Sequence, residues 1–151
     1  MAIRVLFLCT GNSARSLIAE ALLGKLGGDQ FEVFSAGTHP RGVNPYTVRV
    51  LQQEHIDTSG LRSRHVSDFE QDEFDYVITV CDSAAEECPV FPGASERLHW
   101  SIDDPAAVEG SDLEKLAAFQ RTLREMRRRL QLFVPMATRA GVSSGRSLPA
   151  E

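Results

Sequence analysis

The sequence predicts a single α/β domain built on a four-stranded parallel sheet with helices on both faces. Apolar runs typical of buried strands alternate along the chain with segments whose apolar residues recur at helical spacing. Such alternation favours parallel strands joined by right-handed crossovers. The chain has 151 residues, of which 42% are hydrophobic. It is therefore long enough to bury one core without disulfides or a structural metal.

Two strand and helix units are expected in the first third of the chain. Residues 3–9 (IRVLFLC) form an apolar run typical of a strand covered on both faces, and residues 17–26 show helical spacing until a Gly-Gly pair ends the pattern. Residues 31–36 alternate like a second strand. Asn44 is then a helix cap followed by proline, which predicts a helix to about Glu54.

The remaining elements are two strands and one long helix. Residues 75–81 (DYVITVC) are expected to form a buried strand that ends in a cysteine, and residues 97–100 a short fourth strand. Ser111 and Asp112 cap a long helix that Pro135 is expected to end. The apolar stripe of this helix consists of Leu113, Leu116, Leu123, Met126, Leu130 and Phe133.

Composition limits the domain count, the location and the partners. With no internal repeat or linker, we expect one domain over residues 1–140 and a flexible tail over residues 141–151. The net charge of -5 argues against nucleic acid and anionic membrane surfaces as partners. No apolar run is long enough to span a membrane, and no signal peptide is recognisable, which predicts a cytoplasmic protein. The three cysteines are an odd number and are expected to be thiols.

The end of the first strand carries the strongest chemical pattern. Cys9 closes the strand, at the edge where open α/β sheets bind ligands. The loop that follows consists of Thr10, Gly11, Asn12, Ser13, Ala14 and Arg15, with Ser16 directly behind it. Loop amides, a helix N-terminus and the planar guanidinium of Arg15 suit a tetrahedral oxyanion. The same positive field favours a thiolate, so Cys9 is expected to be a nucleophile whose sulfur the Ser16 hydroxyl can hydrogen-bond; a cysteine that only packs is the alternative.

Residues 9–16 resemble the signature loop of the low-molecular-weight protein tyrosine phosphatase family, which includes an arsenate reductase branch. The resemblance extends over roughly residues 3–133. Other matching segments are Phe34 to Gly37, Gly42 to Pro45, Val77 to Cys81, Cys88-Pro89 and His99 to Pro105. The resemblance implies a phosphatase-like four-stranded parallel sheet, with Cys9 as nucleophile, Arg15 as oxyanion clamp and Asp104 as general acid.

Asp104 also has a local argument. A residue that precedes proline is extended or in a turn, so the Asp104 carboxyl is able to project from a loop into the site. A turn residue or the cap of a short helix is the alternative, and spacing alone does not decide between them.

Cys81 and Cys88 distinguish the branches of the family. Cys81 ends a strand expected to be parallel to the first, which places it at the same edge of the sheet as Cys9. Together the three cysteines resemble the redox relay of thioredoxin-coupled arsenate reductases. The resemblance implies a thiol-arsenate adduct on Cys9, attack by Cys81 on Cys9, and transfer of the disulfide to the Cys81/Cys88 pair, which thioredoxin reduces. If the intervening segment were helical, its ends would lie about 10 Å apart, so it must unwind for the pair to bond.

The resemblance also implies a cation site and a set of partners. In one subgroup of these reductases a potassium ion is surrounded by residues that correspond to Asn12, Glu20, Ser35 and Asp68, and oxygen ligands suit such a hard cation. Scattered polar side chains without a cation are the alternative. No other cofactor is expected; the implied partners are arsenate, with phosphate or sulfate as analogues, and thioredoxin as reductant.

The sequence therefore predicts a cytoplasmic arsenate reductase that acts in arsenical detoxification, with residual phosphatase activity compatible with the shared first step. One alternative is a low-molecular-weight protein tyrosine phosphatase in which Cys81 and Cys88 are incidental. The other is a non-catalytic module that binds oxyanions or senses thiol oxidation. Tyrosine phosphatases of the family tend to have aromatic residues near the Asp-Pro loop that hold a phenol ring, whereas Ala106, Ala107 and Val108 offer none.

Overall fold

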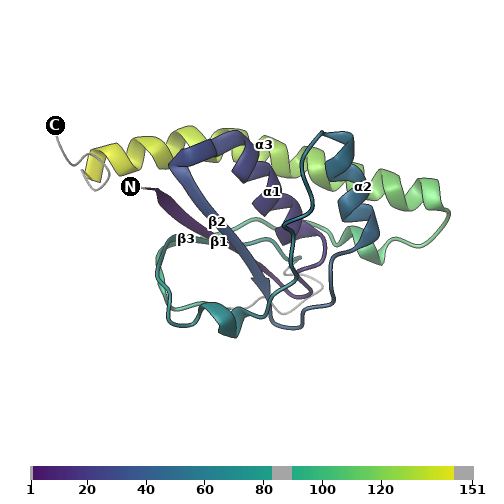
Figure 1. The fold of residues 1–151 in the computed structure, drawn as a ribbon, viewed down its shortest axis with the longest axis horizontal. Helices are drawn as coiled ribbons and strands as arrows, with labels where there is room; N and C mark the ends of the chain where they lie inside the picture. The colour runs from purple at the N-terminus through teal and green to yellow at the C-terminus, as the bar shows by residue number, and fades with distance from the viewer. Residues whose placement is uncertain (1, 83–89, 145–151) are drawn as a thin grey trace.

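The computed structural model describes residues 2–82 and 90–144. Within these residues, four strands form one parallel sheet in the order β2-β1-β3-β4 (Figure 1). The elements run in the order β1 (Ile3–Cys9), α1 (Arg15–Gly27), η1 (Gly28–Gln30), β2 (Phe31–Gly37), α2 (Pro45–Gln53), η2 (Val66–Phe69), β3 (Phe74–Thr79), β4 (Ala94–His99), η3 (Pro105–Ala107) and α3 (Asp112–Ser144). The predicted four-stranded parallel sheet is confirmed.

Strand β1 lies in the centre of the sheet and ends at Cys9. It pairs with β2 from Ile3 to Cys9 and with β3 from Val5 to Leu8. All residues from Val5 to Cys9 are buried, because both faces of this strand are covered. This is the arrangement that the continuous apolar run predicted, and it delivers Cys9 to the carboxyl edge of the sheet.

The two faces of the sheet are covered in different ways. Helices α1, α2 and α3 lie together on one face (Figure 1), in one core cluster that includes Val5 and Phe7 of β1. Within the described residues, the other face is covered by the short helix η2 and by edge-to-face aromatic pairs rather than by a long helix. These pairs are Phe34–Phe69, Phe34–Phe74, Phe69–Phe74 and Phe74–Phe91.

The C-terminal end of α1 and the N-terminal end of α2 follow the capping residues predicted from the sequence. Asn44 caps α2 by accepting a hydrogen bond from the Tyr46 backbone N–H at 2.8 Å, and Pro45 occupies the first turn. Helix α1 ends at Gly27, and Gly28 has a positive φ of 56°, a conformation that glycine adopts without strain. Both predicted boundaries are confirmed.

Helix α3 is longer than predicted. Pro135 was expected to end it, but the helix continues to Ser144 with Pro135 inside it. Ala137 beyond the proline is fully buried in the core, and this burial offsets the hydrogen bond that proline cannot donate. The first four residues of the expected tail are thus helical, and residues 145–151 lie outside the described part. Leu113, expected in the apolar stripe, is 75% exposed.

Strands β3 and β4 are each shifted toward the N-terminus of their predicted ranges. β3 spans Phe74–Thr79 rather than 75–81, and β4 spans Ala94–His99 rather than 97–100. Single backbone hydrogen bonds continue beyond the strand ends, from Val80 N to Leu8 O at 2.9 Å and from Trp100 N to Thr79 O at 2.8 Å. The segment after β3 therefore stays attached to the end of β1.

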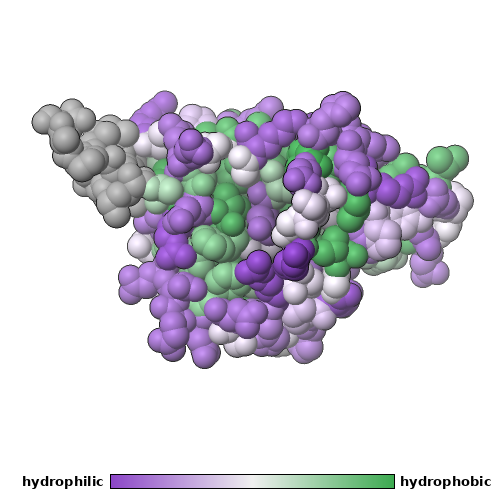
Figure 2. All heavy atoms as spheres, in the orientation of Figure 1, coloured by the Kyte–Doolittle hydropathy of each residue, from purple (hydrophilic) through white to green (hydrophobic). Residues whose placement is uncertain are grey.

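The outer surface of α3 is hydrophilic along most of its length in the space-filling view (Figure 2). Two of its arginines, Arg128 and Arg129, form ion pairs with Glu125 within the helix, as expected of a solvated face rather than a binding patch. None of the described helices combines the length and the apolar character that crossing a membrane requires.

Candidate active site

A small cavity lies where the loop between β1 and α1 meets two other loops. The residues that line it are Cys9, Thr10, Gly11, Ser13, Ala14, Arg15, Arg41 and Asp104. Six of these belong to the predicted signature loop and its cysteine, and Asp104 arrives from the loop before η3. The structure thus brings most of the predicted oxyanion site into one cavity, and it adds Arg41, which the sequence did not indicate.

The Cys9 sulfur is held by two groups of its own loop. Its side chain is buried and is a free thiol. The Ser16 Oγ lies 2.8 Å from Cys9 Sγ, and the Asn12 backbone N–H donates to the same sulfur at 3.2 Å. Donors around a sulfur stabilise the thiolate, which is the nucleophilic form of cysteine.

Asn12 supports the loop from behind. Its φ of 44° is left-handed, a conformation that asparagine tolerates better than most residues. Its amide nitrogen donates to Ser16 Oγ at 2.8 Å and to Ser35 Oγ at 3.0 Å, and its Oδ1 accepts from the Arg64 backbone N–H at 2.6 Å. Of the predicted oxyanion-loop residues, Asn12 alone does not line the cavity. Because its amide donates to Ser16, the Ser16 hydroxyl proton is available to the Cys9 sulfur.

Arg15 is buried and reaches the loop that carries Asp104. Its side chain is 4% exposed; Nη1 donates to the Ile102 carbonyl at 3.0 Å, and Nη2 lies 3.8 Å from Asp104 Oδ2. The Ile102 contact orients the guanidinium before any ligand enters. Such preorganisation is what an oxyanion clamp requires.

Asp104 satisfies both interpretations that the sequence left open. Its backbone is extended, with φ -77° and ψ 109°, and its Oδ1 caps η3 by accepting from the Ala106 N–H at 3.0 Å. Its other oxygen faces Arg15 across the cavity. One carboxylate thus both caps a short helix and faces the cavity.

The loop after β2, residues 38–44, is joined to the signature loop by backbone hydrogen bonds. Three of its N–H groups donate to carbonyls of the signature loop: His39 to Thr10 at 2.8 Å, Arg41 to Gly11 at 2.9 Å and Asn44 to Ser13 at 3.1 Å. Gly37 lies where the loop begins, and a Cβ there would lie 2.5 Å from the Thr10 carbonyl oxygen. A glycine at the end of a strand was the only signal in the sequence for this close approach.

Three of the four residues predicted to surround a cation form one hydrogen-bonded chain. Ser35 accepts from Asn12 and donates to Glu20 Oε1 at 2.6 Å. Burial raises the pKa of Glu20, while the Ser35 hydrogen bond and the positive charge of Arg64 oppose that shift. Asp68 is exposed, and in the part of the chain that the structure describes it forms no hydrogen bond with the other three. Carboxylate, amide and hydroxyl oxygens are suitable ligands for a hard cation. The Asn12 oxygen already accepts from the Arg64 N–H and has one further lone pair for such an ion.

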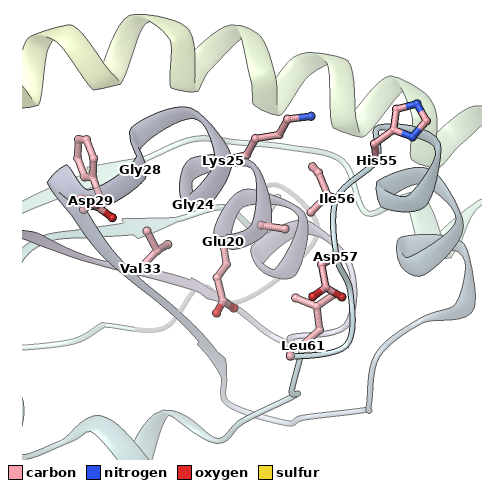
Figure 3. A pocket seen from close by; sticks show the side chains of 13 residues that line it. Glu20, Gly24, Lys25, Gly28, Asp29, Val33, His55, Ile56, Asp57 and Leu61 are labelled. Carbon is pink, nitrogen blue, oxygen red and sulfur yellow. The ribbon is translucent and has the colours of Figure 1, made fainter.

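Glu20 also lines a larger cavity between α1, β2 and the segment after α2. This cavity has a volume of about 660 Å³, and Glu20 extends from α1 toward the segment that carries Asp57 and Leu61 (Figure 3). Its lining mixes acidic, basic and apolar side chains. The link from Glu20 through Ser35 joins this cavity to the back of the signature loop.

Cys81 lies two residues beyond the end of β3 and is fully buried. The bond from Val80 N to Leu8 O holds this segment against the end of β1, the strand that closes with Cys9. Cys9 is free, whereas Cys81 is disulfide-bonded. The third predicted relay residue, Cys88, lies outside the described residues.

Comparison with known proteins gives a consistent set of relatives. Residues 4–141 match the family described as Low molecular weight phosphotyrosine protein phosphatase. An arsenate reductase of Halalkalibacterium halodurans is 43% identical over 129 residues, which is 85% of this chain and 93% of that protein. The crystal structure of an arsenate reductase from Archaeoglobus fulgidus has a TM-score of 0.73 at 29% identity and covers 87% of this chain and 98% of that one. A thioredoxin-dependent arsenate reductase of Corynebacterium glutamicum has a TM-score of 0.60 at 30% identity, over 87% of this chain and 63% of that one.

Proposed function

Since the chain belongs to the low molecular weight phosphotyrosine protein phosphatase family, we propose that it is an arsenate reductase that converts arsenate to arsenite with Cys9 as nucleophile. The observation that carries this proposal is the second buried cysteine, Cys81. It lies two residues after β3, in a segment that a hydrogen bond from Val80 holds against the strand that ends in Cys9. A phosphatase needs no second thiol there. A reductase needs one to supply the electrons.

The first step is formation of a covalent adduct. Arsenate enters the cavity with its oxygens toward the signature-loop amides and Arg15. The Cys9 sulfur forms a bond to arsenic, one arsenic–oxygen bond breaks, and the oxygen leaves as water with a proton from Asp104. The position of Asp104 Oδ2, 3.8 Å from Arg15 Nη2, supports this role, because a ligand held by Arg15 lies within reach of the carboxyl.

The second step is the transfer of two electrons to arsenic. The Cys81 thiolate attacks the Cys9 sulfur, a disulfide forms, and the sulfur–arsenic bond breaks with its electron pair left on arsenic, which departs as arsenite. Cys88 then attacks the Cys81 sulfur and frees Cys9. Thioredoxin reduces the Cys81/Cys88 disulfide by the same exchange chemistry. The free thiol of Cys9 and the disulfide-bonded state of Cys81 support a cycle in which Cys9 is released before thioredoxin acts.

The proposed cycle also indicates a partner and a location. A relay that ends in a disulfide requires a dithiol reductant, and the likeness to a thioredoxin-dependent enzyme supports thioredoxin in that role. The cycle starts from free thiols, which the reducing cytosol maintains. We therefore propose a cytoplasmic enzyme of arsenical detoxification.

A coupled assay tests the function. With thioredoxin, thioredoxin reductase and NADPH, arsenate should cause steady NADPH oxidation with one arsenite formed per NADPH. Turnover of an aryl phosphate without any reductant measures the phosphatase alternative on the same sample. Fast aryl phosphate hydrolysis together with no arsenite would identify the chain as a phosphatase, whereas slow hydrolysis is expected because both reactions share the first step.

We also propose that a potassium ion is bound by Glu20, Asn12 and Ser35. The ion would neutralise the half-buried Glu20 carboxylate and stabilise the chain of hydrogen bonds behind the signature loop. A higher melting temperature in potassium chloride than in choline chloride, lost in Glu20→Gln, is the expected result. Equal melting temperatures in the two salts would exclude the site.

Cysteine variants test the relay directly. Cys88→Ser should release about one arsenite per enzyme and then stop as a Cys9/Cys81 disulfide, because that bond needs only those two thiols. Cys81→Ser should stop earlier, as the thiol-arsenate adduct, and release no arsenite. Intact-mass analysis of the stalled proteins distinguishes the two. Multiple turnovers by Cys88→Ser with thioredoxin would show that the order of the relay is wrong.

Asp104→Asn should slow adduct formation by about a hundredfold or more, the usual loss when a general acid is removed. Asparagine keeps the cap of η3, so the change removes the proton without removing the hydrogen bond to Ala106. Rapid-mixing measurement of the first step reports the effect, and Asp103→Asn, which changes the adjacent exposed carboxylate, is the matched control. An unchanged first step in Asp104→Asn would leave this residue only its capping role.

A further inference from the structure

Arg41 lies directly over the signature loop. Its backbone N–H donates to the Gly11 carbonyl at 2.9 Å. Its side chain crosses Gly11 so closely that a Cβ on that glycine would lie 3.2 Å from Arg41 Cδ and 3.3 Å from Nε. The missing side chain of Gly11 is what allows the arginine to reach the rim of the cavity that contains Cys9.

The charge of Arg41 is not engaged by the protein. Among residues 2–82 and 90–140, its guanidinium has no ion pair and no hydrogen-bond partner, although the side chain lines the cavity. Arg15 differs, because its guanidinium donates to Ile102 and faces Asp104. The cavity thus has an inner cation that the fold holds in place and an outer cation that is exposed to solvent.

The groups that line the cavity favour a second cation beside a bound anion. Attack on arsenic needs the thiolate form of Cys9, Asp104 adds a carboxyl group, and the whole chain has a net charge of -5. Arsenate is mostly a dianion at neutral pH. A second guanidinium beside the ligand, in addition to Arg15 and the loop amides, lowers the repulsion between a thiolate and a dianion and can form charge-assisted hydrogen bonds.

We propose, on the basis of the proposed function, that Arg41 is a substrate-binding residue that recognises the double negative charge of the tetrahedral oxyanion from the solvent side of the cavity. Arsenite is neutral at neutral pH and makes no ion pair with Arg41. The same residue therefore favours entry of the oxidised substrate without retaining the reduced product. Arg41 contributes to binding and selectivity, while the bond-making steps stay with Cys9 and Arg15.

The test compares Arg41→Gln and Arg41→Lys with the control Arg62→Gln. Arg62 is an exposed arginine whose guanidinium donates to the Ser59 and Leu61 carbonyls and which does not line the cavity. Calorimetry with sulfate gives a binding constant that needs no turnover, and steady-state kinetics with arsenate give KM and kcat. We expect Arg41→Gln to raise both the sulfate Kd and the arsenate KM about tenfold, the loss expected for one charge-assisted contact.

The pattern across the variants decides the proposal. The kcat of Arg41→Gln should stay within about twofold of the original value, Arg41→Lys should recover part of the affinity because its charge is kept, and Arg62→Gln should leave both constants unchanged. A sulfate Kd unaffected by Arg41→Gln, or an equal loss in Arg62→Gln, would overturn the role of Arg41. If the unmodified protein binds sulfate but forms no arsenite, the proposed function fails, and the sulfate measurement still tests Arg41.

Discussion

Cys9→Ser should form no arsenite at all, even in a single turnover. A serine hydroxyl at this position is not ionised at neutral pH, and an oxygen nucleophile cannot pass two electrons to arsenic through a disulfide. Any arsenite formed by the variant should lie below the detection limit of chromatography. Oxyanion binding should persist, because Arg15 is held by the Ile102 carbonyl rather than by the sulfur, and a serine oxygen can still accept from the Asn12 N–H.

Sulfate calorimetry on the same preparation is therefore the control for Cys9→Ser. A variant that binds sulfate with near-original affinity and melts at a similar temperature has a folded site without its nucleophile. Arsenite formation by this folded variant would assign the chemistry to another residue. Cys81 would then be the first candidate, since it is the other described cysteine at this edge of the sheet.

Arg15→Lys should lower kcat/KM for arsenate by about two to three orders of magnitude, the range seen when one oxyanion-stabilising group is removed. Lysine keeps the charge but loses the planar fork. It also cannot donate to the Ile102 carbonyl and reach a ligand at the same time, as the two terminal nitrogens of Arg15 are positioned to do. The loss is expected mainly in kcat, because the charge that develops during adduct formation is stabilised less well.

A matched change at the surface separates this effect from a general loss of arginine. Arg49 is exposed and pairs with Asp112 at 2.9 Å, and a surface pair of this kind contributes little to stability. Arg49→Lys should therefore leave kcat and KM unchanged. If Arg15→Lys retained near-normal kinetics, the oxyanion would have to be held by the loop amides and Arg41 alone.

The sequence predicts the position of Cys9 at the strand end better than the support around it. An apolar strand that ends in Cys9 before a Gly and Asn loop is a local pattern, and the structure has that strand end at the same residue. The role of Asn12 is different, because its left-handed φ turns the side chain away from the cavity toward Ser16 and Ser35. A sequence pattern gives the residue type in a loop but not the direction of its side chain.

Arg41 and Pro135 show the other limit of sequence reasoning. Arg41 reaches the site only because backbone hydrogen bonds join two loops that are distant in sequence. Pro135 has the local signature of a helix end, yet the burial of Ala137 prolongs the helix. In both cases tertiary packing, which no short segment encodes, decides the outcome.

The contact between Arg15 and the Ile102 carbonyl has a consequence for the order of folding. It joins positions 87 residues apart. The pairing of the central strand β1 with β3 likewise joins segments that are distant in sequence. Contacts between distant segments form late, since the entropy of closing long loops has to be overcome first. During synthesis, the oxyanion clamp thus stays unassembled until the ribosome has released the segment beyond β4. A nascent chain that already carries Cys9 has no oriented Arg15 guanidinium until then, so the thiol is synthesised before the site around it can assemble.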